Sequence, residues 1–143
     1  MIYKNKPKDF NAKFEVVGCF CEYDGKIILL HRQNHKPEGN TWCLPAGKID
    51  DQEDSIQASI REVKEETGID IFPEQIELVE SVYIKFPTYH FVYHTFRAIL
   101  KNPHDVIINN SEHKDFKWVR PVDALKMNLI EDEDECIKMC YKL

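Results

Sequence analysis

Apolar positions follow two different periods along the chain, and these periods separate predicted strands from predicted helices. Residues 14–21 and 26–31 are mostly apolar, and Asp24-Gly25 lies between them, which predicts a β-hairpin. Residues 76–85 and 91–100 run apolar or alternate, so they are predicted as two further strands joined by a short loop. A last, short strand is predicted over residues 116–119.

The spacing changes to that of a helix from Glu53 to Glu66. Its predicted buried stripe comprises Ile56, Ile60 and Val63, at positions i, i+4 and i+7. Gly68 follows, where a helix commonly ends with a left-handed residue. A helix is also predicted to open over residues 121–125 and a terminal one to cover 131–141. Strands and helices in this order favour an α/β sandwich with a mixed β-sheet.

Length and charge limit the kind of protein this is. A chain of 143 residues fits one domain, 1–143, with a sizeable core. The net charge of −6 argues against a nucleic-acid polymer as partner, because such a surface needs a basic footprint. An acidic enzyme can still bind nucleotide phosphates when a metal ion supplies local positive charge.

The chain is expected to be cytoplasmic and to have no membrane partner. Residues 1–13 are lysine-rich but lack the apolar run of a secretory signal, and the apolar run 16–21 is too short to cross a bilayer. The five cysteines do not show zinc-ribbon spacing, which favours reduced thiols.

Residues 47–69 carry the most informative pattern, G-x5-E-x7-R-E-V-x-E-E-x-G-I. On the predicted helix, Glu62, Glu65 and Glu66 lie at i, i+3 and i+4, so their carboxylates share one face. Such a face is often only solvated surface. Here the like charges repel, and a hard divalent cation such as Mg²⁺ would compensate them and leave coordination sites for phosphates.

This pattern is the complete signature of the Nudix hydrolase family, and the chain resembles that family from about Val16 to Leu125. The resemblance implies a Nudix-type α/β/α sandwich with a mixed β-sheet. By position it also implies metal binding by three carboxylates and one backbone carbonyl: Glu62, Glu65, Glu66 and Gly47. Mg²⁺ is the expected ion, with Mn²⁺ as a substitute.

The resemblance further implies that Glu53 is an outer carboxylate that pairs with Arg61 and supports the site. The fork of Arg61 suits bidentate binding of a carboxylate such as Glu53 or Glu65. Glu62 is a candidate to orient or deprotonate the attacking water. Family members differ in which carboxylate is the general base, so that assignment stays open.

A second patch lies downstream, where many Nudix enzymes have a glutamate six residues before a tryptophan. Glu112 precedes Trp118 by six residues and is therefore a candidate metal ligand or general base, against the alternative of an exposed loop residue. His113 is expected to be a surface loop histidine. Ala46 stands where relatives often have glycine, so the turn before Gly47 is expected to differ slightly.

Candidate substrate contacts lie outside the signature. Arg32 and Lys48 could meet phosphates or be solvated, and Phe86 and Tyr89 could stack on a base or only pack. Two residues of the acidic run 131–135, Asp132 and Asp134, could accept hydrogen bonds from a purine edge. The alternative for that run is an acidic helix N-terminus stabilised by the helix dipole.

The predicted reaction is Mg²⁺-dependent attack of water on a phosphorus within a diphosphate linkage of a small nucleotide. The most favoured substrate is a nucleoside triphosphate, (d)NTP, cleaved to (d)NMP and pyrophosphate. The alternatives are an ADP-ribose, nucleotide-sugar or dinucleoside polyphosphate pyrophosphohydrolase, or a non-catalytic nucleotide sensor. The exposed face of the sheet could also form a homodimer, and the residues leave this open.

Overall fold

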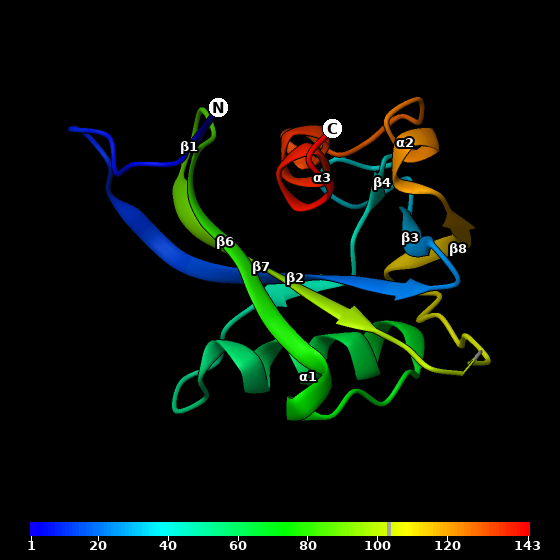
Figure 1. The fold of residues 1–143 in the computed structure, drawn as a ribbon. Coiled ribbons are helices and arrows are strands. Elements are labelled where there is room, and N and C mark those ends of the chain that lie inside the picture. The colour runs from blue at the N-terminus through cyan, green and yellow to red at the C-terminus, as the bar shows by residue number, and fades with distance from the viewer. Residues whose placement is uncertain (103) are drawn as a thin grey trace.

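The computed structural model describes residues 1–102 and 104–143 and contains a sheet with helices on both faces (Figure 1). Its strands are β1 (Ile2–Tyr3), β2 (Ala12–Tyr23), β3 (Lys26–Arg32), β4 (Trp42–Cys43), β5 (Ala46–Lys48), β6 (Ile76–Lys85), β7 (His90–Ile99) and β8 (His113–Val119). Its helices are α1 (Ser55–Thr67), α2 (Pro121–Ala124) and α3 (Glu133–Tyr141), with a 3₁₀ turn η1 (Pro73–Gln75).

The sheet is mixed, as the sequence predicted. Along its main path the strand order is β1-β6-β7-β2-β3-β4, with β5 paired to β2 and β8 to β3. The long central strands β2 and β7 run parallel, and the other named pairs are antiparallel. Helix α1 covers one face while α2 and α3 lie on the other, so the α/β/α sandwich is confirmed (Figure 1).

Strand β2 changes partner along its length, and this change positions the start of the signature. Its end pairs with β3 through the predicted hairpin, where Asp24 and Gly25 have positive φ angles of 52° and 73°. Its middle pairs instead with β5, which sets Gly47 opposite Val17. The backbone of the signature is therefore fixed to the centre of the sheet before α1 begins.

Helix α1 lies close to its predicted range. Asp54 is its N-cap and forms a capping box with Gln57, and Gly68 ends it at a φ of 78°. The prediction that Ile56 is buried is wrong, because its side chain is 38% exposed. Ile56 lies in the first turn, beyond the core cluster that includes Ala58 and Val63.

Two apolar cores lie on opposite faces of the sheet, as the alternation along β2 requires. The core on the α1 side includes Val17, Cys19 and Val63, and the core on the α3 side includes Phe20 and Ile137. All five cysteines are free, which agrees with the prediction of thiols. Within the described residues, no helix is both long enough and apolar enough to span a membrane.

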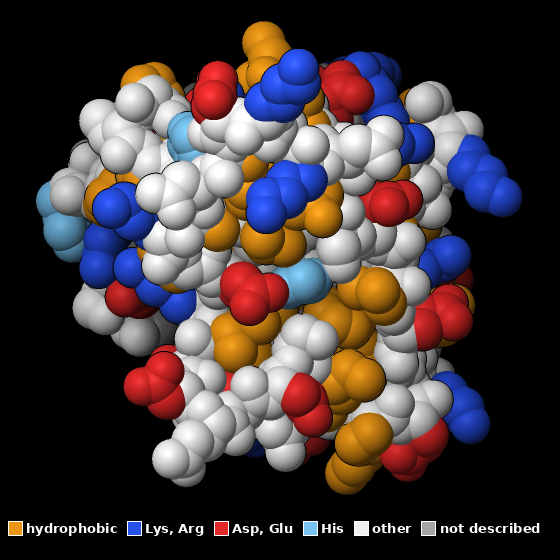
Figure 2. Space-filling view, turned by 90° about the vertical axis from the view of Figure 1, so that its left-hand side faces the viewer, with side chains coloured by type: hydrophobic (Ala, Val, Ile, Leu, Met, Phe, Trp, Pro, Cys, Tyr) orange, Lys and Arg blue, Asp and Glu red, His pale blue; other side chains and the backbone are white. Residues whose placement is uncertain are grey.

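The face shown in Figure 2 carries charges of both signs. Lysine and arginine side chains are interspersed there with aspartate and glutamate, between small hydrophobic patches. Positive charge is therefore not gathered into one stripe on this face.

A charged cluster attaches the end of α3 to the sheet. Glu22 Oε1 accepts hydrogen bonds from Arg97 Nη2 at 2.8 Å and from the Tyr141 hydroxyl at 2.8 Å. The Arg97 guanidinium also lies 4.9 Å from the centre of the Tyr141 ring. These contacts join α3 to β2 and β7, and they hold the helix that closes one side of the cavity described below.

Tyr141→Phe should therefore lower the free energy of unfolding by about 1 kcal/mol, because one hydrogen bond to a half-buried carboxylate is lost. Urea denaturation measures the change. Tyr3→Phe is the control, since within the described residues the Tyr3 hydroxyl hydrogen-bonds only to the sulfur of Met1. Equal destabilisation by both variants would contradict the role given to the Glu22 cluster.

Candidate active site

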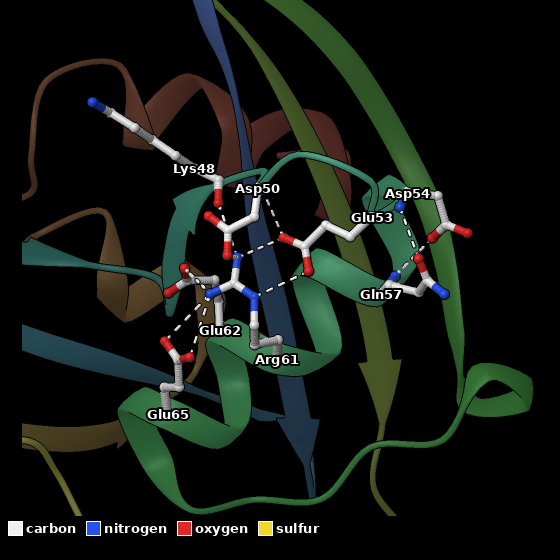
Figure 3. A network of polar contacts seen from close by, with 8 residues as sticks. All are labelled: Lys48, Asp50, Glu53, Asp54, Gln57, Arg61, Glu62 and Glu65. Carbon is white, nitrogen blue, oxygen red and sulfur yellow. Dashed lines mark hydrogen bonds and ion pairs between the residues drawn. The ribbon is translucent and has the colours of Figure 1, made fainter.

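Arg61, in the middle of α1, is the centre of a network of carboxylates (Figure 3). Its Nη2 and Nε donate to the two oxygens of Glu53 at 2.6 and 3.1 Å. Its Nη1 donates to Glu62 at 2.8 Å and lies 3.3 Å from Glu65, while Nη2 also reaches the carbonyl of Lys48 at 3.0 Å. One guanidinium thus binds Glu53 in bidentate fashion and connects α1 to β5.

The charges in this network shift the acidities of its members. Hydrogen bonds from Arg61 hold the pKa of Glu53 below its usual range, and Glu53 in turn raises the pKa of Arg61. The pKa of Glu62 is raised because its side chain is largely buried, and Arg61 only partly opposes this effect. The side chain of Glu65 is 57% exposed.

The carboxylate of Glu62 occupies the space beside Gly47 on β5. A Cβ built at Gly47 would overlap that carboxylate, so a larger residue would displace Glu62 from the position in which Arg61 holds it; the φ of Gly47 itself is not positive. One residue earlier, the backbone N–H of Ala46 donates to Glu66 Oε1 at 2.8 Å. Burial raises the pKa of Glu66 well above its usual value, and the charges of Glu62 and Glu112 add to the effect.

Glu112 lies in the turn before β8, a segment far from α1 in the sequence, and its charge acts on Glu66. Its Oε1 forms an ion pair with Lys36 Nζ at 3.2 Å. Among residues 1–102 and 104–143, no group of three or more acidic, histidine or cysteine side chains is gathered closely enough to enclose a metal ion. Arg61 instead holds Glu62 and Glu65, so the predicted ligand set stays a prediction.

A cavity of about 590 Å³ opens beside these carboxylates, within the size range of small-molecule sites. Gly47, Lys48 and Glu66 line it where it meets the signature. Aromatic side chains from β2, β7 and the loop before β7 line it elsewhere, namely Phe14, Phe86, Tyr89, Phe91 and Tyr93. The cavity therefore joins an apolar, aromatic wall to a cluster of carboxylates.

All four predicted substrate residues line this cavity. The Arg32 Nε donates to the carbonyl of Pro37 at 2.9 Å, and Lys48 Nζ lies 4.2 Å from the centre of the Phe14 ring. Phe86 and Tyr89 pack edge to face, with centroids 5.4 Å apart. The structure thus brings them together, and both packing and stacking remain compatible with the aromatic pair.

The sequence reading missed Glu133, a buried carboxyl that lines the cavity. Its Oε1 accepts from the N–H of Leu44 at 3.1 Å, and its Oε2 from the hydroxyl of Tyr93 at 3.3 Å. Burial raises the pKa of Glu133 to about 7. Gly18 makes the arrangement possible, because a Cβ there would overlap the Tyr93 hydroxyl.

The burial of Glu133 could not be predicted from the sequence, because it is one of five consecutive acidic residues and nothing in the run indicates which side chain points inward. Of the two residues predicted to read a base, Asp132 lines the cavity and forms an ion pair with the Met1 amino group at 3.3 Å. Asp134 is not among the cavity-lining residues and lines a separate, smaller depression. The alternative of an acidic helix N-terminus also holds, because Glu133 to Glu135 form the first turn of α3.

His113 is not a surface loop residue as expected. It begins strand β8, pairs with Arg32, and is 1% exposed. Burial, with the nearby charge of Arg32, lowers its pKa to about 4, so the ring is neutral near pH 7. The short match to Glu112 and Trp118 gave no indication of this burial, which follows from the pairing of β8 with β3.

Comparison with known proteins decides the family, because the NUDIX domain model matches residues 13–140. This chain belongs to the Nudix family. An asymmetrical bis(5'-nucleosyl)-tetraphosphatase from Caenorhabditis elegans is 36% identical over 109 residues, which cover 72% of this chain and 75% of that protein. An 8-oxo-dGTP diphosphatase from Proteus vulgaris is 34% identical over 73 residues, 51% of this chain.

The match spans 63% of the Proteus protein, less than two thirds of its length. Among solved structures, the NUDIX domain of Shewanella oneidensis NrtR, complexed with ADP ribose, superposes with a TM-score of 0.78 at 27% identity. That match covers 96% of this chain and 92% of the other.

Glu133→Gln should change how the stability of this Nudix protein depends on pH. An unfolded glutamate ionises near pH 4.5, whereas the folded carboxyl ionises near 7, so wild-type stability is lost as pH rises through this window. Glutamine cannot ionise. We therefore compare the difference in melting temperature, variant minus wild type, at two pH values. This difference should be more positive at pH 8 than at pH 5, by roughly 5 °C.

Differential scanning calorimetry at both pH values measures this difference. Glu135→Gln is the control, because Glu135 lies on the same helix with its side chain 47% exposed. A pH-independent effect of Glu133→Gln would show that the buried carboxyl does not ionise as described.

Proposed function

We propose that this Nudix hydrolase is a Mg²⁺-dependent pyrophosphohydrolase that converts a nucleoside triphosphate to the monophosphate and pyrophosphate. One observation carries the proposal: the aromatic-lined cavity reaches Gly47 and Glu66 of the signature without interruption. A nucleotide whose base enters the cavity has its phosphates beside the carboxylates. Arg32 and Lys48, which line the same cavity, supply positive charge for these phosphates.

The donor atoms fit a hard divalent cation. Glu62, Glu65, Glu66 and Glu112 are the carboxylates proposed to hold it, together with the carbonyl of Gly47. Oxygen donors of this kind suit Mg²⁺, and Mn²⁺ can substitute. When bound, the ion supplies positive charge for the phosphate oxygens in the transition state.

The chain itself positions and deprotonates the attacking water. Water attacks a phosphorus, the bond from that phosphorus to the leaving phosphate oxygen breaks, and the water proton passes to a carboxylate. Glu62 and Glu112 are the two candidates for this base. Arg61 fixes Glu62 and Glu53 by the hydrogen bonds described above, which supports a positioning role for the arginine.

The aromatic wall suits a nucleobase. Phe86 and Tyr89 offer faces for stacking, and base–aromatic stacking contributes about 1–3 kcal/mol per base. Glu133 lies in the same cavity with both oxygens already oriented by Leu44 and Tyr93. We place the base among these residues and the triphosphate toward Glu66.

The second candidate is a dinucleoside polyphosphate hydrolase, favoured by the 36% identity to the Caenorhabditis elegans tetraphosphatase. Cleavage of ADP-ribose or a nucleotide sugar is a third, since the NrtR domain was solved with ADP ribose. All three use the same carboxylates. A sensor without turnover would not need every acidic residue of the signature, and all of them are present.

Product identification by mass spectrometry separates these candidates. The protein with Mg²⁺ is incubated with deoxy- and ribonucleoside triphosphates, oxidised triphosphates, ADP-ribose, nucleotide sugars and dinucleoside polyphosphates. Monophosphate plus pyrophosphate from triphosphates supports the proposal, and cleavage of linked diphosphates alone overturns it. Repeating the reaction in ¹⁸O-labelled water identifies the attacked phosphorus from the product that carries the label.

Glu65→Gln should lower kcat by roughly 100-fold or more, because a proposed metal-binding oxygen is lost. The fold should persist, since the Glu65 side chain is mostly exposed. Steady-state kinetics and Mn²⁺ titration by electron paramagnetic resonance measure both effects. Glu74→Gln, an exposed glutamate of η1, is the control. Near-wild-type turnover in Glu65→Gln would refute the metal assignment.

Glu112→Gln should lower kcat by roughly 100-fold if Glu112 is the general base, and should change the acidic limb of the rate-versus-pH profile. Asp115→Asn is the matched control, because Asp115 is exposed on the same strand that Glu112 precedes. An unchanged rate and profile would return Glu112 to the role of a surface partner for Lys36.

A further inference from the structure

His113 lines the cavity, and one of its ring nitrogens is buried without a hydrogen-bond partner in the described part of the chain. The residue lines the cavity together with Arg32 and Cys43, and only 1% of its surface is exposed. Its Nδ1 has no hydrogen-bond partner within residues 1–102 and 104–143. Buried polar atoms are nearly always paired, so an unpaired one in a residue that lines a cavity calls for an explanation.

The neighbours of the other ring nitrogen determine what Nδ1 can do. The thiol of Cys43 donates to the carbonyl of Leu30, with a sulfur–oxygen distance of 3.6 Å. Its sulfur therefore has only lone pairs to offer His113 Nε2, which lies 3.8 Å away. The proton of a neutral imidazole then belongs on Nε2, and Nδ1 is left as a bare acceptor.

A bare acceptor needs a donor, and this excludes most of a nucleotide's polyphosphate. Ionised phosphate oxygens only accept, whereas sugar hydroxyls and base N–H groups donate. His113 lies next to Glu112 in the chain and pairs with Arg32, so it is on the side of the cavity that meets the charged residues. The sugar is the part of a nucleotide that joins the phosphates to the base.

We propose that His113 Nδ1 accepts a hydrogen bond from a sugar hydroxyl of the bound nucleotide and so helps to select the substrate. This inference rests on the proposed function, because it takes the cavity as the nucleotide site. The cysteine thiol has the supporting role of fixing the tautomer. A substrate that lacks the hydroxyl leaves Nδ1 buried without a partner, which is the more costly state.

Nitrogen NMR tests the contact without requiring turnover. The chain has six histidines, and His113→Asn identifies the His113 signals by their loss. Two-bond ¹H–¹⁵N spectra of the wild type report the tautomer and the Nδ1 shift. They are recorded with Mg²⁺ alone and then with the α,β-methylene analogues of ATP and GTP. The Nδ1 signal should move upfield with the ribose analogue. It should fail to move with one of the two deoxy forms, 2'-deoxy or 3'-deoxy, and the form that fails identifies the hydroxyl.

Two substitutions separate a contact from a structural role. In His113→Asn the Oδ1 atom can replace Nδ1 as acceptor, whereas in His113→Gln the polar group extends toward the place of Nε2. Wild type should prefer the hydroxyl-bearing triphosphate by roughly 5- to 150-fold in kcat/KM. His113→Asn should keep most of this preference and His113→Gln should lose it, while a purely structural role predicts equal losses on all substrates.

The outcomes distinguish this inference from the proposed function. Nδ1 shifts that are the same with and without each hydroxyl, or that already show a bond to water before ligand is added, overturn the role of His113. Shifts caused by a base N–H, seen as dependence on the base alone, also overturn it. Absence of pyrophosphate release from every triphosphate overturns the proposed function instead, and the NMR result with the uncleavable analogue stands independently of that.

Discussion

The guanidinium of Arg61 is the interaction on which the site depends. One side chain on α1 binds Glu53 through two nitrogens, holds Glu62 with a third contact, and reaches the carbonyl of Lys48 on β5. Without this cation, several carboxylates would face one another across a tight junction between helix and strand. The position that Glu62 takes beside Arg61 is open because Gly47 has no side chain. Lysine could not replace Arg61, since a single ammonium group lacks the planar fork that makes these bonds together.

The sequence predicted those parts of the molecule that depend on local spacing. The limits of α1 and the hairpin at Asp24-Gly25 follow from capping and turn residues, which act within a few positions. The short strand β5 was not predicted, because three residues have too little pattern and its pairing with β2 is a long-range contact. The burial of His113 was missed for the same reason, since it results from pairing with Arg32 across 81 positions of sequence, from 32 to 113.

The cavity shows the same limit on a larger scale. The signature supplies Gly47 and Glu66, while Phe14, Phe86 and Glu133 come from segments that only the sheet and α3 bring together. The chemistry of the carboxylates could therefore be predicted from the signature segment alone. The shape of the cavity could not, because it depends on segments that are far apart in the sequence. This division suits a family in which one reaction serves several nucleotides, because the cavity can vary while the signature helix stays the same.

The buried carboxyl at Glu133 has a consequence for how ligand binding is measured. Its pKa of about 7 means that a neutral solution contains both the protonated and the ionised form. A ligand that donates hydrogen bonds to this carboxyl selects the ionised form and releases a proton to the buffer, whereas one that accepts selects the protonated form and takes a proton up. Binding enthalpies measured by calorimetry would then vary with the ionisation enthalpy of the buffer. The sign of that variation reports whether the part of the ligand beside Glu133 donates or accepts hydrogen bonds.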